Sequence, residues 1–375
     1  MKRVFIYVQH LLGIGHFMRM SRIACALAEG PFEVTVASGG MPVPQISLGK
    51  AHLVQLPPAR ADASGFSTLL DPDGQPFTRK AEARRAALLI GAFAAARPDA
   101  LLIEAFPFAR RQMRFELLPL LEHARAQSPR PVILSSIRDI LQESRKPGRA
   151  GEALALVEAY FDYVLVHGDG AATPLAASFP LASNFVDKIV YTGLVGPPPI
   201  GAPIHDHDVI VSAGGGAVGE NLIRSALLAR PLTALRDARW LVITGPNMPD
   251  AAAAEFTALA GGRVTLERFV SHLPQRLAGA ALSISQAGYN TVAEVLAAGC
   301  RSVLVPFAAQ GETEQTARAQ GLARRGLAVS VEEAGLTPRR LAAAIAQALA
   351  APAPAAPGPQ DGAAMTRALL ERRLT

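Results

Sequence analysis

Short apolar runs alternate with amphipathic stretches along the first half of the chain. A run such as Val4–Val8 is too short for a helix and is typical of a strand buried in a parallel sheet. The pattern predicts strands at 4–8, 33–37, 100–103, 132–135 and 163–166, and helices at about 17–29, 78–96, 110–127 and 151–161. Strands that alternate with helices in this way indicate a doubly wound α/β domain.

The same alternation resumes in the second half of the chain. It predicts strands at 209–213, 240–244, 264–266, 282–285, 302–305 and 328–330, which indicate a second doubly wound domain. Between the halves, residues 193–207 are rich in proline, a composition typical of a semi-rigid linker. We therefore divide the chain into a first domain at 1–192, the linker at 193–207, a nucleotide-binding domain at 208–350, and an Ala/Pro-rich segment with a terminal helix at 351–375.

Composition narrows the range of partners. A net charge of +6, carried mostly by arginine, favours anionic partners, but no arginine run with interleaved aromatic residues indicates nucleic-acid binding. Cys25 and Cys300 are the only cysteines, so a zinc pattern and a disulfide framework are both excluded and a reducing compartment is expected. No apolar run is long enough to span a membrane. We expect a cytoplasmic protein, with at most peripheral attachment at the inner face of the membrane.

A glycine-rich loop follows the first strand of the second half. Val209–Ala213 runs into Gly214, Gly215 and Gly216, and Gly219 comes just before a predicted helix. Glycines let the backbone approach a diphosphate closely and expose several N–H donors. The loop lacks the Lys-Ser/Thr ending of a P-loop, so it does not predict NTP hydrolysis. We interpret it as a diphosphate-binding loop, and a flexible turn is the alternative.

The stretch from Ser285 to Gln315 carries a second candidate site. A strand ends at a polar turn and a helix begins near Asn290, where free N–H groups would attract phosphate. Glu294 would repel that phosphate unless it points further along the ligand, for example to the two hydroxyls of a ribose. Glu314 and the amide beside it follow the next strand and can accept from and donate to sugar hydroxyls.

The first half offers a candidate base. Its loop Gly13-Ile14-Gly15-His16 has Met18 where a dinucleotide fingerprint needs a third glycine, so we set NAD aside. His16 lies near a helix N-terminus, whose dipole favours a neutral imidazole that can accept a proton. A capping or packing histidine is the alternative, and His10 is the competing candidate.

Charged residues also follow two strands of the first half. Glu104, Asp139 and Arg138 come at or just after the carboxyl ends of predicted strands, where a ligand crevice would open. Either acid could orient His16 or hold an acceptor hydroxyl, and helix caps or solvated turns are the alternative.

An aromatic and basic patch lies close by, formed by Phe106, Pro107 and Phe108 together with Arg110, Arg111 and Arg114. It could dock an anionic lipid surface, but helix packing with a solvated basic face is favoured.

Together these motifs resemble those of the GT-B glycosyltransferases. Gln286-Ala-Gly288-Tyr289-Asn290-Thr291-Val-Ala-Glu294, followed by Pro306 and Glu314-Gln315, is similar to the signature of the UDP-glycosyltransferases. With the glycine loop, this region also resembles the C-terminal domain of the transferase that makes lipid II. The similarity is clearest over about 209–349, and the first half matches mainly in its Gly-x-Gly-His loop. The resemblance implies a GT-B fold, with two Rossmann-like domains facing each other across a cleft and the terminal helix returning to the first.

The resemblance also implies roles for individual residues. Gly288 and Asn290 would lie against the donor diphosphate, Glu294 would bind the ribose, and Glu314 with Gln315 would hold the sugar. The segment from Phe269 to Pro274 would flank the nucleobase, and His16 would be the base, oriented by Glu104 or Asp139. The full expected donor set is Gly15, Gly214, Gly215, Gly216, Phe269, Val270, Gln286, Gly288, Tyr289, Asn290, Thr291, Glu294, Glu314 and Gln315.

Two positions depart from the family pattern. Gln286 stands where many relatives have a histidine that touches phosphate; it can donate a hydrogen bond but cannot become cationic. Tyr289 replaces the usual tryptophan. Because the lipid II transferase resemblance fails over much of the first half, its acceptor is not carried across.

The expected function is transfer of a sugar from a nucleoside diphosphate sugar to a hydroxyl of an acceptor. A UDP-sugar is the favoured donor, and the acceptor could be lipid-linked. We expect a reaction that needs no metal and no cofactor. The resemblance favours an inverting reaction in cell-envelope or glycoconjugate synthesis. The alternatives are a nucleotide-sugar hydrolase or epimerase of the same fold, and a non-catalytic nucleotide-sugar-binding protein.

Overall fold

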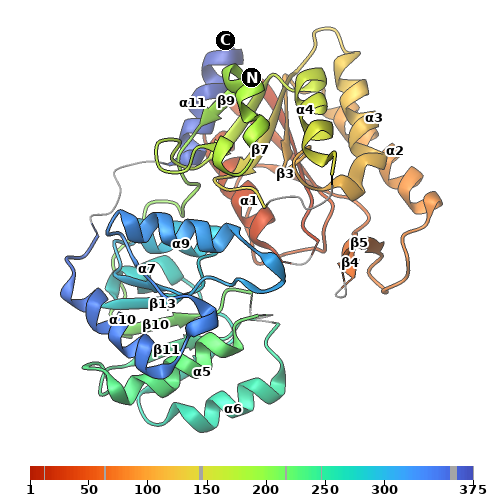
Figure 1. The fold of residues 1–375 in the computed structure, drawn as a ribbon. Helices are drawn as coiled ribbons and strands as arrows, with labels where there is room; N and C mark the ends of the chain where they lie inside the picture. The colour runs from red at the N-terminus through yellow and green to blue at the C-terminus, as the bar shows by residue number, and fades with distance from the viewer. Residues whose placement is uncertain are drawn as a thin grey trace. The chain divides into compact units, whose positions relative to one another are not determined.

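The computed structural model describes residues 1–11, 13–62, 65–142, 147–215, 218–245, 247–354 and 361–374. It divides the chain into two compact units, one formed by 1–195 with 360–375 and the other by 196–359. Each unit has a parallel sheet with helices on both faces (Figure 1). The predicted α/β class and the two doubly wound halves are confirmed.

The sheet of the first unit has its strands in the order β3-β2-β1-β6-β7-β8-β9 over the described residues, with all neighbours parallel. The strands are β1 (Lys2–Val8), β2 (Phe32–Ser38), β3 (His52–Gln55), β6 (Ala100–Glu104), β7 (Val132–Arg138), β8 (Tyr163–His167) and β9 (Ile189–Tyr191). The winding direction changes between β1 and β6. In sheets of this kind, ligands bind at the carboxyl ends of the strands at such a switch point.

Alternate side chains of β1 enter two different cores because successive residues of a strand point to opposite faces. Val4 and Ile6 pack against α1 (Gly15–Ala28) and α11 (Gly362–Leu374), whereas Phe5 and Tyr7 pack against α2 (Arg79–Ala96) and α3 (Arg114–Arg125). A third cluster packs α4 (Arg149–Tyr160) against β7 and β8. This double burial explains why the strands have nearly continuous apolar sequences.

The terminal helix α11 belongs to the first unit although it follows the second unit in sequence (Figure 1). Gly362 donates its N–H to the carbonyl of Leu194 at 3.0 Å, and Arg367 donates to the carbonyl of Ala26 at 3.4 Å. Leu369 and Leu370 complete the core against α1. The chain therefore crosses back to its first unit after the second is complete.

The predicted linker at 193–207 does not form a segment of its own. Residues 193–195 belong to the first unit and 196–207 to the second. The N–H of Ile204 donates to the carbonyl of Gln275 at 3.0 Å, and Gly279 packs against the Ile204 backbone, which holds this proline-rich stretch on the second unit.

Some short elements of the first unit were not predicted. β3 and β9 are edge strands without a fully buried residue, so they lack the apolar run that marks the inner strands. The proline- and glycine-rich stretch at 57–76 contains an antiparallel hairpin of β4 (Arg60–Asp62) and β5 (Gly65–Leu70). The hairpin was not predicted because the proline and glycine residues of this stretch are typical of turns rather than strands.

The sheet of the second unit has the order β12-β11-β10-β13-β14-β15 over the described residues, again with parallel neighbours. The strands are β10 (Val209–Ser212), β11 (Trp240–Ile243), β12 (Val264–Glu267), β13 (Leu282–Ser285), β14 (Ser302–Leu304) and β15 (Val329–Ser330), all within about two residues of their predicted bounds. Here the winding changes direction between β10 and β13. The glycine loop follows β10 and the Gly288 turn follows β13, so both meet at this switch point.

Helices cover both faces of this sheet as well. One face packs against α5 (Glu220–Ala229), α6 (Asp250–Ala260) and α10 (Pro338–Ala350). The other packs against α7 (Leu273–Gly279) and α8 (Tyr289–Ala297), and α9 (Glu314–Arg324) follows β14. Among the helices of the described ranges, none is long and apolar enough to cross a bilayer.

Candidate active site

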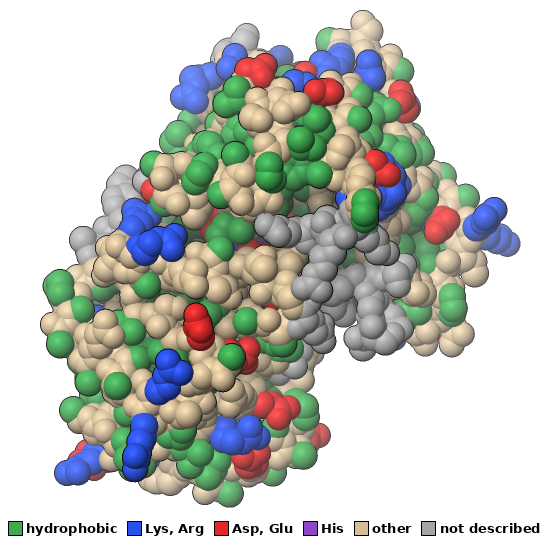
Figure 2. All heavy atoms as spheres, in the orientation of Figure 1, with side chains coloured by type: hydrophobic (Ala, Val, Ile, Leu, Met, Phe, Trp, Pro, Cys, Tyr) green, Lys and Arg blue, Asp and Glu red, His purple; other side chains and the backbone are tan. Residues whose placement is uncertain are grey.

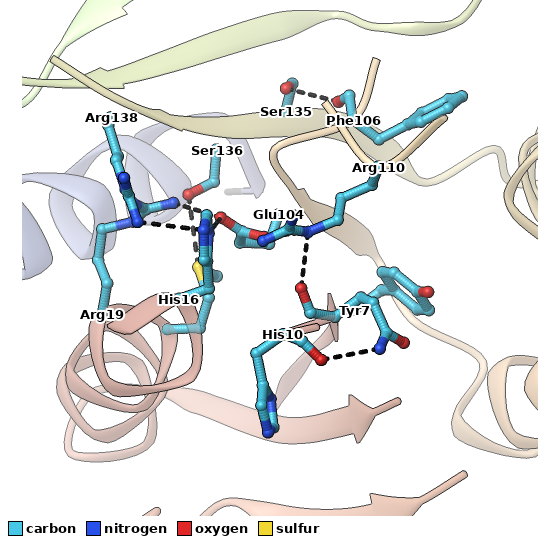
Figure 3. Close-up of polar contacts among 12 residues, drawn as sticks. Tyr7, His10, His16, Arg19, Glu104, Phe106, Arg110, Ser135, Ser136 and Arg138 are labelled. Carbon is cyan, nitrogen blue, oxygen red and sulfur yellow. Dashed lines mark hydrogen bonds and ion pairs between the residues drawn. The ribbon is translucent and has the colours of Figure 1, made fainter. Parts of the chain in front are cut away.

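His16 and Glu104 meet at the switch point of the first unit. His16 lies in the first turn of α1, just after β1, and Glu104 is the last residue of β6, the neighbour of β1 in the sheet. The ring nitrogen Nδ1 of His16 lies 2.5 Å from Oε1 of Glu104 (Figure 3). The strand order therefore brings together two residues that are far apart in sequence.

The other ring nitrogen of His16 defines the tautomer. Arg138, at the end of β7, lies with its Nη2 3.1 Å from Nε2 of His16 (Figure 3). A guanidinium can only donate, so Nε2 accepts and the ring proton is on Nδ1, where it is donated to Glu104. The arrangement matches a histidine base whose tautomer is fixed by a carboxylate.

The surroundings keep His16 neutral. Burial lowers the pKa of His16 to about 3, with further lowering by Arg110 and Arg138 against the opposing charge of Glu104. Burial alone would raise the pKa of Glu104, but His16, Arg19 and Arg110 hold it well below the usual range. At neutral pH the pair is thus an uncharged imidazole and a carboxylate, which is the state that a proton-accepting histidine requires.

Glu104 is surrounded by arginines. Arg19, from the second turn of α1, donates to its Oε1 at 2.6 Å, and Nε of Arg110 lies 3.8 Å from its Oε2. Both Glu104 and Arg19 have almost no exposed surface. Two guanidinium groups therefore lie at the carboxylate, and that of Arg138 lies at the other nitrogen of the His16 ring.

A second buried charge network supports the loop after β1. Arg85 of α2 donates to Oε2 of Glu116 on α3 at 2.7 Å, and also hydrogen-bonds the side chain of Gln9. The carbonyl of Gln9 accepts from Nε of Arg110 at 2.7 Å, and Arg110 faces Glu104. The position of the His16–Glu104 pair is therefore tied to α2 and α3, two helices of the opposite layer.

The structure separates His16 from its competitors. The ring of His10 packs against Gly40, and its Nε2 lies 2.9 Å from the carbonyl of Met41, so His10 has a packing role. Of the two acids, Glu104 contacts His16, whereas Asp139 is buried against Gly168. The catalytic role of Asp139 stays a prediction.

The aromatic and basic patch lines a cavity of about 1040 Å³ within the first unit. Its wall includes Phe106, Phe108 and Phe179, and its arginines are Arg110, Arg111, Arg114 and Arg149. Phe106 and Phe108 pack in the two adjoining apolar clusters, and the Arg111 side chain is 45 % exposed, which agrees with the preferred expectation of helix packing with a solvated basic face. Arg110 joins the cavity to the corner of Glu104.

Basic residues are dispersed on the face of the protein that Figure 2 shows. Figure 2 shows Lys and Arg side chains in small separate groups on the face in view, with Asp and Glu among them. This distribution is unlike the continuous basic stripe that nucleic-acid-binding proteins present.

The glycine loop of the second unit is held by Gln286. Gly214 has a left-handed backbone with φ of 62°, and a Cβ on Gly219 would collide with Ala213. Nε2 of Gln286 donates to the carbonyl of Val218 at 2.8 Å. Gln286, which stands in place of the family histidine, thus holds the glycine loop through its side chain. Gly216 lies outside the described residues.

The turn after β13 leads directly into α8. Gly288 is the N-cap and provides no side-chain cap, Asn290 and Thr291 lie in the first turn, and Glu294 is 8 % exposed further along the helix. Tyr289 is buried and lies under the guanidinium of Arg318 at 5.7 Å from the ring centroid. The first turn of α8 is therefore built as the sequence predicts, with N–H groups that can face an anion.

Arg318 of α9 was not predicted and connects several predicted donor residues. It donates to the carbonyl of Ala287 at 2.8 Å and to Oε1 of Glu314 at 2.7 Å. Gln315 accepts the N–H of Phe307 at 3.2 Å, which holds the turn after β14. Glu314 and Gln315 are thus fixed in place before any ligand binds.

The predicted nucleobase segment follows β12. Phe269 is 66 % exposed, and Val270 packs on the apolar cluster beneath α7 and α8. No group of three or more His, Cys, Asp and Glu side chains suited to a metal occurs in the part of the chain that the structure describes.

Comparison with known structures decides the fold. The crystal structure of MurG from Acinetobacter baumannii matches with a TM-score of 0.59 and 16 % identity, over 99 % of this chain and all of that one. The calicheamicin glycosyltransferase CalG4 matches with a TM-score of 0.63 and 14 % identity, over 100 % of this chain and 97 % of that one. This chain has the GT-B fold.

Sequence similarity is concentrated in the second half of this GT-B chain. Residues 209–369 match the family described as Glycosyltransferase family 28 C-terminal domain. A UDP-N-acetylglucosamine–N-acetylmuramyl-(pentapeptide) pyrophosphoryl-undecaprenol N-acetylglucosamine transferase of Rhodospirillum centenum is 39 % identical over 123 residues, which is 33 % of this chain and 32 % of the relative. The protein of the same name from an Exiguobacterium species is 32 % identical over 146 residues, 39 % and 40 % of the two chains. The chain thus aligns with about a third of the length of these relatives.

Proposed function

We propose that this protein is a glycosyltransferase that moves a sugar from a nucleoside diphosphate sugar to a hydroxyl of an acceptor. The observation that carries the proposal is the neutral His16, whose Nδ1 proton is held by Glu104 at the switch point of the first sheet. General bases of this kind lower the barrier to attack by a hydroxyl. The GT-B fold and the family 28 match of residues 209–369 support the same reaction class.

The donor that we propose is a UDP-sugar, because the relatives named above act on UDP-N-acetylglucosamine. Its diphosphate would lie against the first turn of α8 and the glycine loop, where N–H groups and a helix dipole meet its charge. Glu294 would bind the ribose hydroxyls, and Glu314 with Gln315 would hold the sugar. Phe269 and Val270 would flank the base.

The reaction would proceed without a protein-bound covalent intermediate. Nε2 of His16 takes the proton of the acceptor hydroxyl while its oxygen forms a bond to the anomeric carbon. The bond from that carbon to the diphosphate oxygen breaks, and the electron pair leaves with the diphosphate, whose charge is met by backbone donors. This scheme requires no metal and no cofactor. It inverts the configuration at the anomeric carbon of the sugar.

The cavity beside Arg110 is the proposed place of the acceptor. Its aromatic wall suits an acceptor with an apolar portion, a class that includes lipid-linked compounds. The relatives act on a pyrophosphoryl-undecaprenol compound, which supports a cytoplasmic protein working at the inner face of a membrane.

A thermal-shift panel of UDP, GDP, dTDP and their sugars tests the donor proposal. A ligand that binds the native state raises its melting temperature by mass action, so UDP or a UDP-sugar should give the largest shift. Glu294→Ala should weaken UDP binding by about 10- to 100-fold, the effect of losing hydrogen bonds to a charged group. Glu332→Ala, an exposed carboxylate of the same unit, is the matched control and should bind UDP as the wild type does. A flat response to every nucleotide would refute the proposed donor site.

A further inference from the structure

Gln286 connects the two elements of the second unit that we expect to meet a diphosphate. Its backbone belongs to the turn between β13 and α8, and its side chain reaches the glycine loop that follows β10. Nε2 of Gln286 donates to the carbonyl of Val218 at 2.8 Å, and the residue is 7 % exposed. A carbonyl can only accept, so this contact fixes the amide with its nitrogen towards Val218.

The orientation of this amide limits what it can do for a phosphate. Its oxygen Oε1 lies 3.9 Å from the place that a Cβ on Gly214 would take, at the start of the loop. An amide oxygen and a phosphate oxygen both only accept hydrogen bonds, so the oxygen end of Gln286 cannot bind a phosphate. At the nitrogen end, a proton is already donated to Val218. The side chain is therefore placed to hold the loop.

Longer contacts hold the start of the same loop. Oγ of Ser212 accepts the N–H of Gly214 at 3.3 Å, and the carbonyl of Gly215 accepts the N–H of Asn247 at 3.4 Å. The bond from Gln286 is the shortest of the three and holds the end of the loop that leads into α5. A glycine-rich segment loses much conformational entropy when it is ordered, so its shape depends on such contacts.

We propose that Gln286 is a positioning residue for the donor, which holds the glycine loop so that its N–H groups and those of the first turn of α8 point at one diphosphate. The inference rests on the proposed function and gives this position a role other than the phosphate contact of the family histidine. Donors that are ordered before the ligand arrives bind it more tightly. Loss of Gln286 should weaken binding of the diphosphate and leave binding of the nucleoside alone unchanged.

Gln286→Met in the full chain tests the proposal, because methionine is of similar length and has no donor. Without ligand, hydrogen exchange followed by mass spectrometry should be faster over residues 212–220 than in the wild type. Calorimetric titration with UDP should show an affinity lower by about 3- to 10-fold, the effect of one hydrogen bond. An NMR titration with uridine should be unchanged. Gln347→Met, on the exposed side of α10, is the matched control and should behave as the wild type throughout.

Gln286→His should restore both properties at pH 8, where the imidazole is neutral and its Nε2–H can donate to the carbonyl of Val218. Gln286→Ala makes the same comparison with the wild type if Gln286→Met does not fold. Weaker UDP binding with loop exchange at the wild-type rate would show a direct phosphate contact and overturn the proposal. Faster exchange with undiminished UDP affinity would overturn it as well. Absence of UDP binding by the wild type is a different result, which would refute the proposed donor itself.

Discussion

Replacing His16 by alanine should lower kcat by about 10²- to 10⁴-fold, the usual contribution of a general base. The loss arises because the other two candidates of the described first unit are engaged: His10 packs against Gly40, and Glu104 accepts a hydrogen bond from Arg19. UDP-sugar binding should be nearly unchanged, since all the proposed donor residues except Gly15 lie in the second unit and the substitution keeps the backbone beside Gly15. Steady-state kinetics and the thermal shift with UDP measure the two effects separately.

The pH profile provides a check on the same residue. Since the pKa of His16 is lowered to about 3, the base is already neutral at pH 5 and kcat/KM should stay level from neutral pH down to about pH 5. An unperturbed histidine would lose activity below about pH 6.5. His52→Ala, on the exposed edge strand β3, is the control and should keep full activity. A His16→Ala protein with undiminished kcat would remove His16 from the mechanism.

Glu104→Gln should destabilise the first unit by about 3–5 kcal/mol, the cost of removing one partner from a buried ion pair. The amide keeps the shape of the carboxylate but leaves Arg19 and Arg110 without the charge that balances them. Activity should fall as well, because the ring proton of His16 is no longer fixed on Nδ1. Urea unfolding followed by circular dichroism measures the stability change.

Glu152→Gln is the matched control for Glu104→Gln. Glu152 also pairs with an arginine of the first unit, but both side chains are about 45 % exposed, so the loss should be below about 1 kcal/mol. Equal losses from the two variants would contradict the account of the buried cluster.

Acid should weaken the wild type through the same cluster. His16 has a folded pKa near 3 and an unfolded value of 6.5, and the pKa of Glu104 is also lower in the folded protein. In both cases the unfolded chain binds more protons, so the stability is present at neutral pH and is lost as pH falls from about 6.5 towards 3.

The sequence was sufficient to predict the inner strands of both sheets, but it did not predict the edge strands β3 and β9 of the first sheet. Strands buried on both faces, such as β1 and β10, are continuous apolar runs and were predicted within two residues of their bounds. β3 has a single partly buried apolar residue, Val54, among exposed positions, which is too little apolar pattern to identify a strand.

The candidate site was predicted in part. His16 could be chosen from its place at a helix start, but Glu104 and Asp139 both follow strands and sequence does not give strand order. The choice needed the pairing of β1 with β6. Arg19 was missed although one signal was present, since it is a charged residue between the apolar Phe17 and Met20 on the buried side of α1.

Contacts over long sequence separation account for the other omissions. Arg85 and Glu116 come from two different helices, and neither has a local motif that distinguishes it from a solvated helix residue. The role of Gln286 in holding the glycine loop likewise depends on Val218, which lies 68 residues away.

The most direct test of glycosyl transfer is product analysis with a UDP-sugar labelled in its sugar. Purified protein is incubated with the donor, with and without a set of hydroxyl compounds, and the products are separated and identified by mass spectrometry. The account predicts that the label moves to an acceptor and that His16→Ala abolishes this transfer. Release of free labelled sugar at the same rate with and without acceptors would instead identify a hydrolase and contradict the central claim.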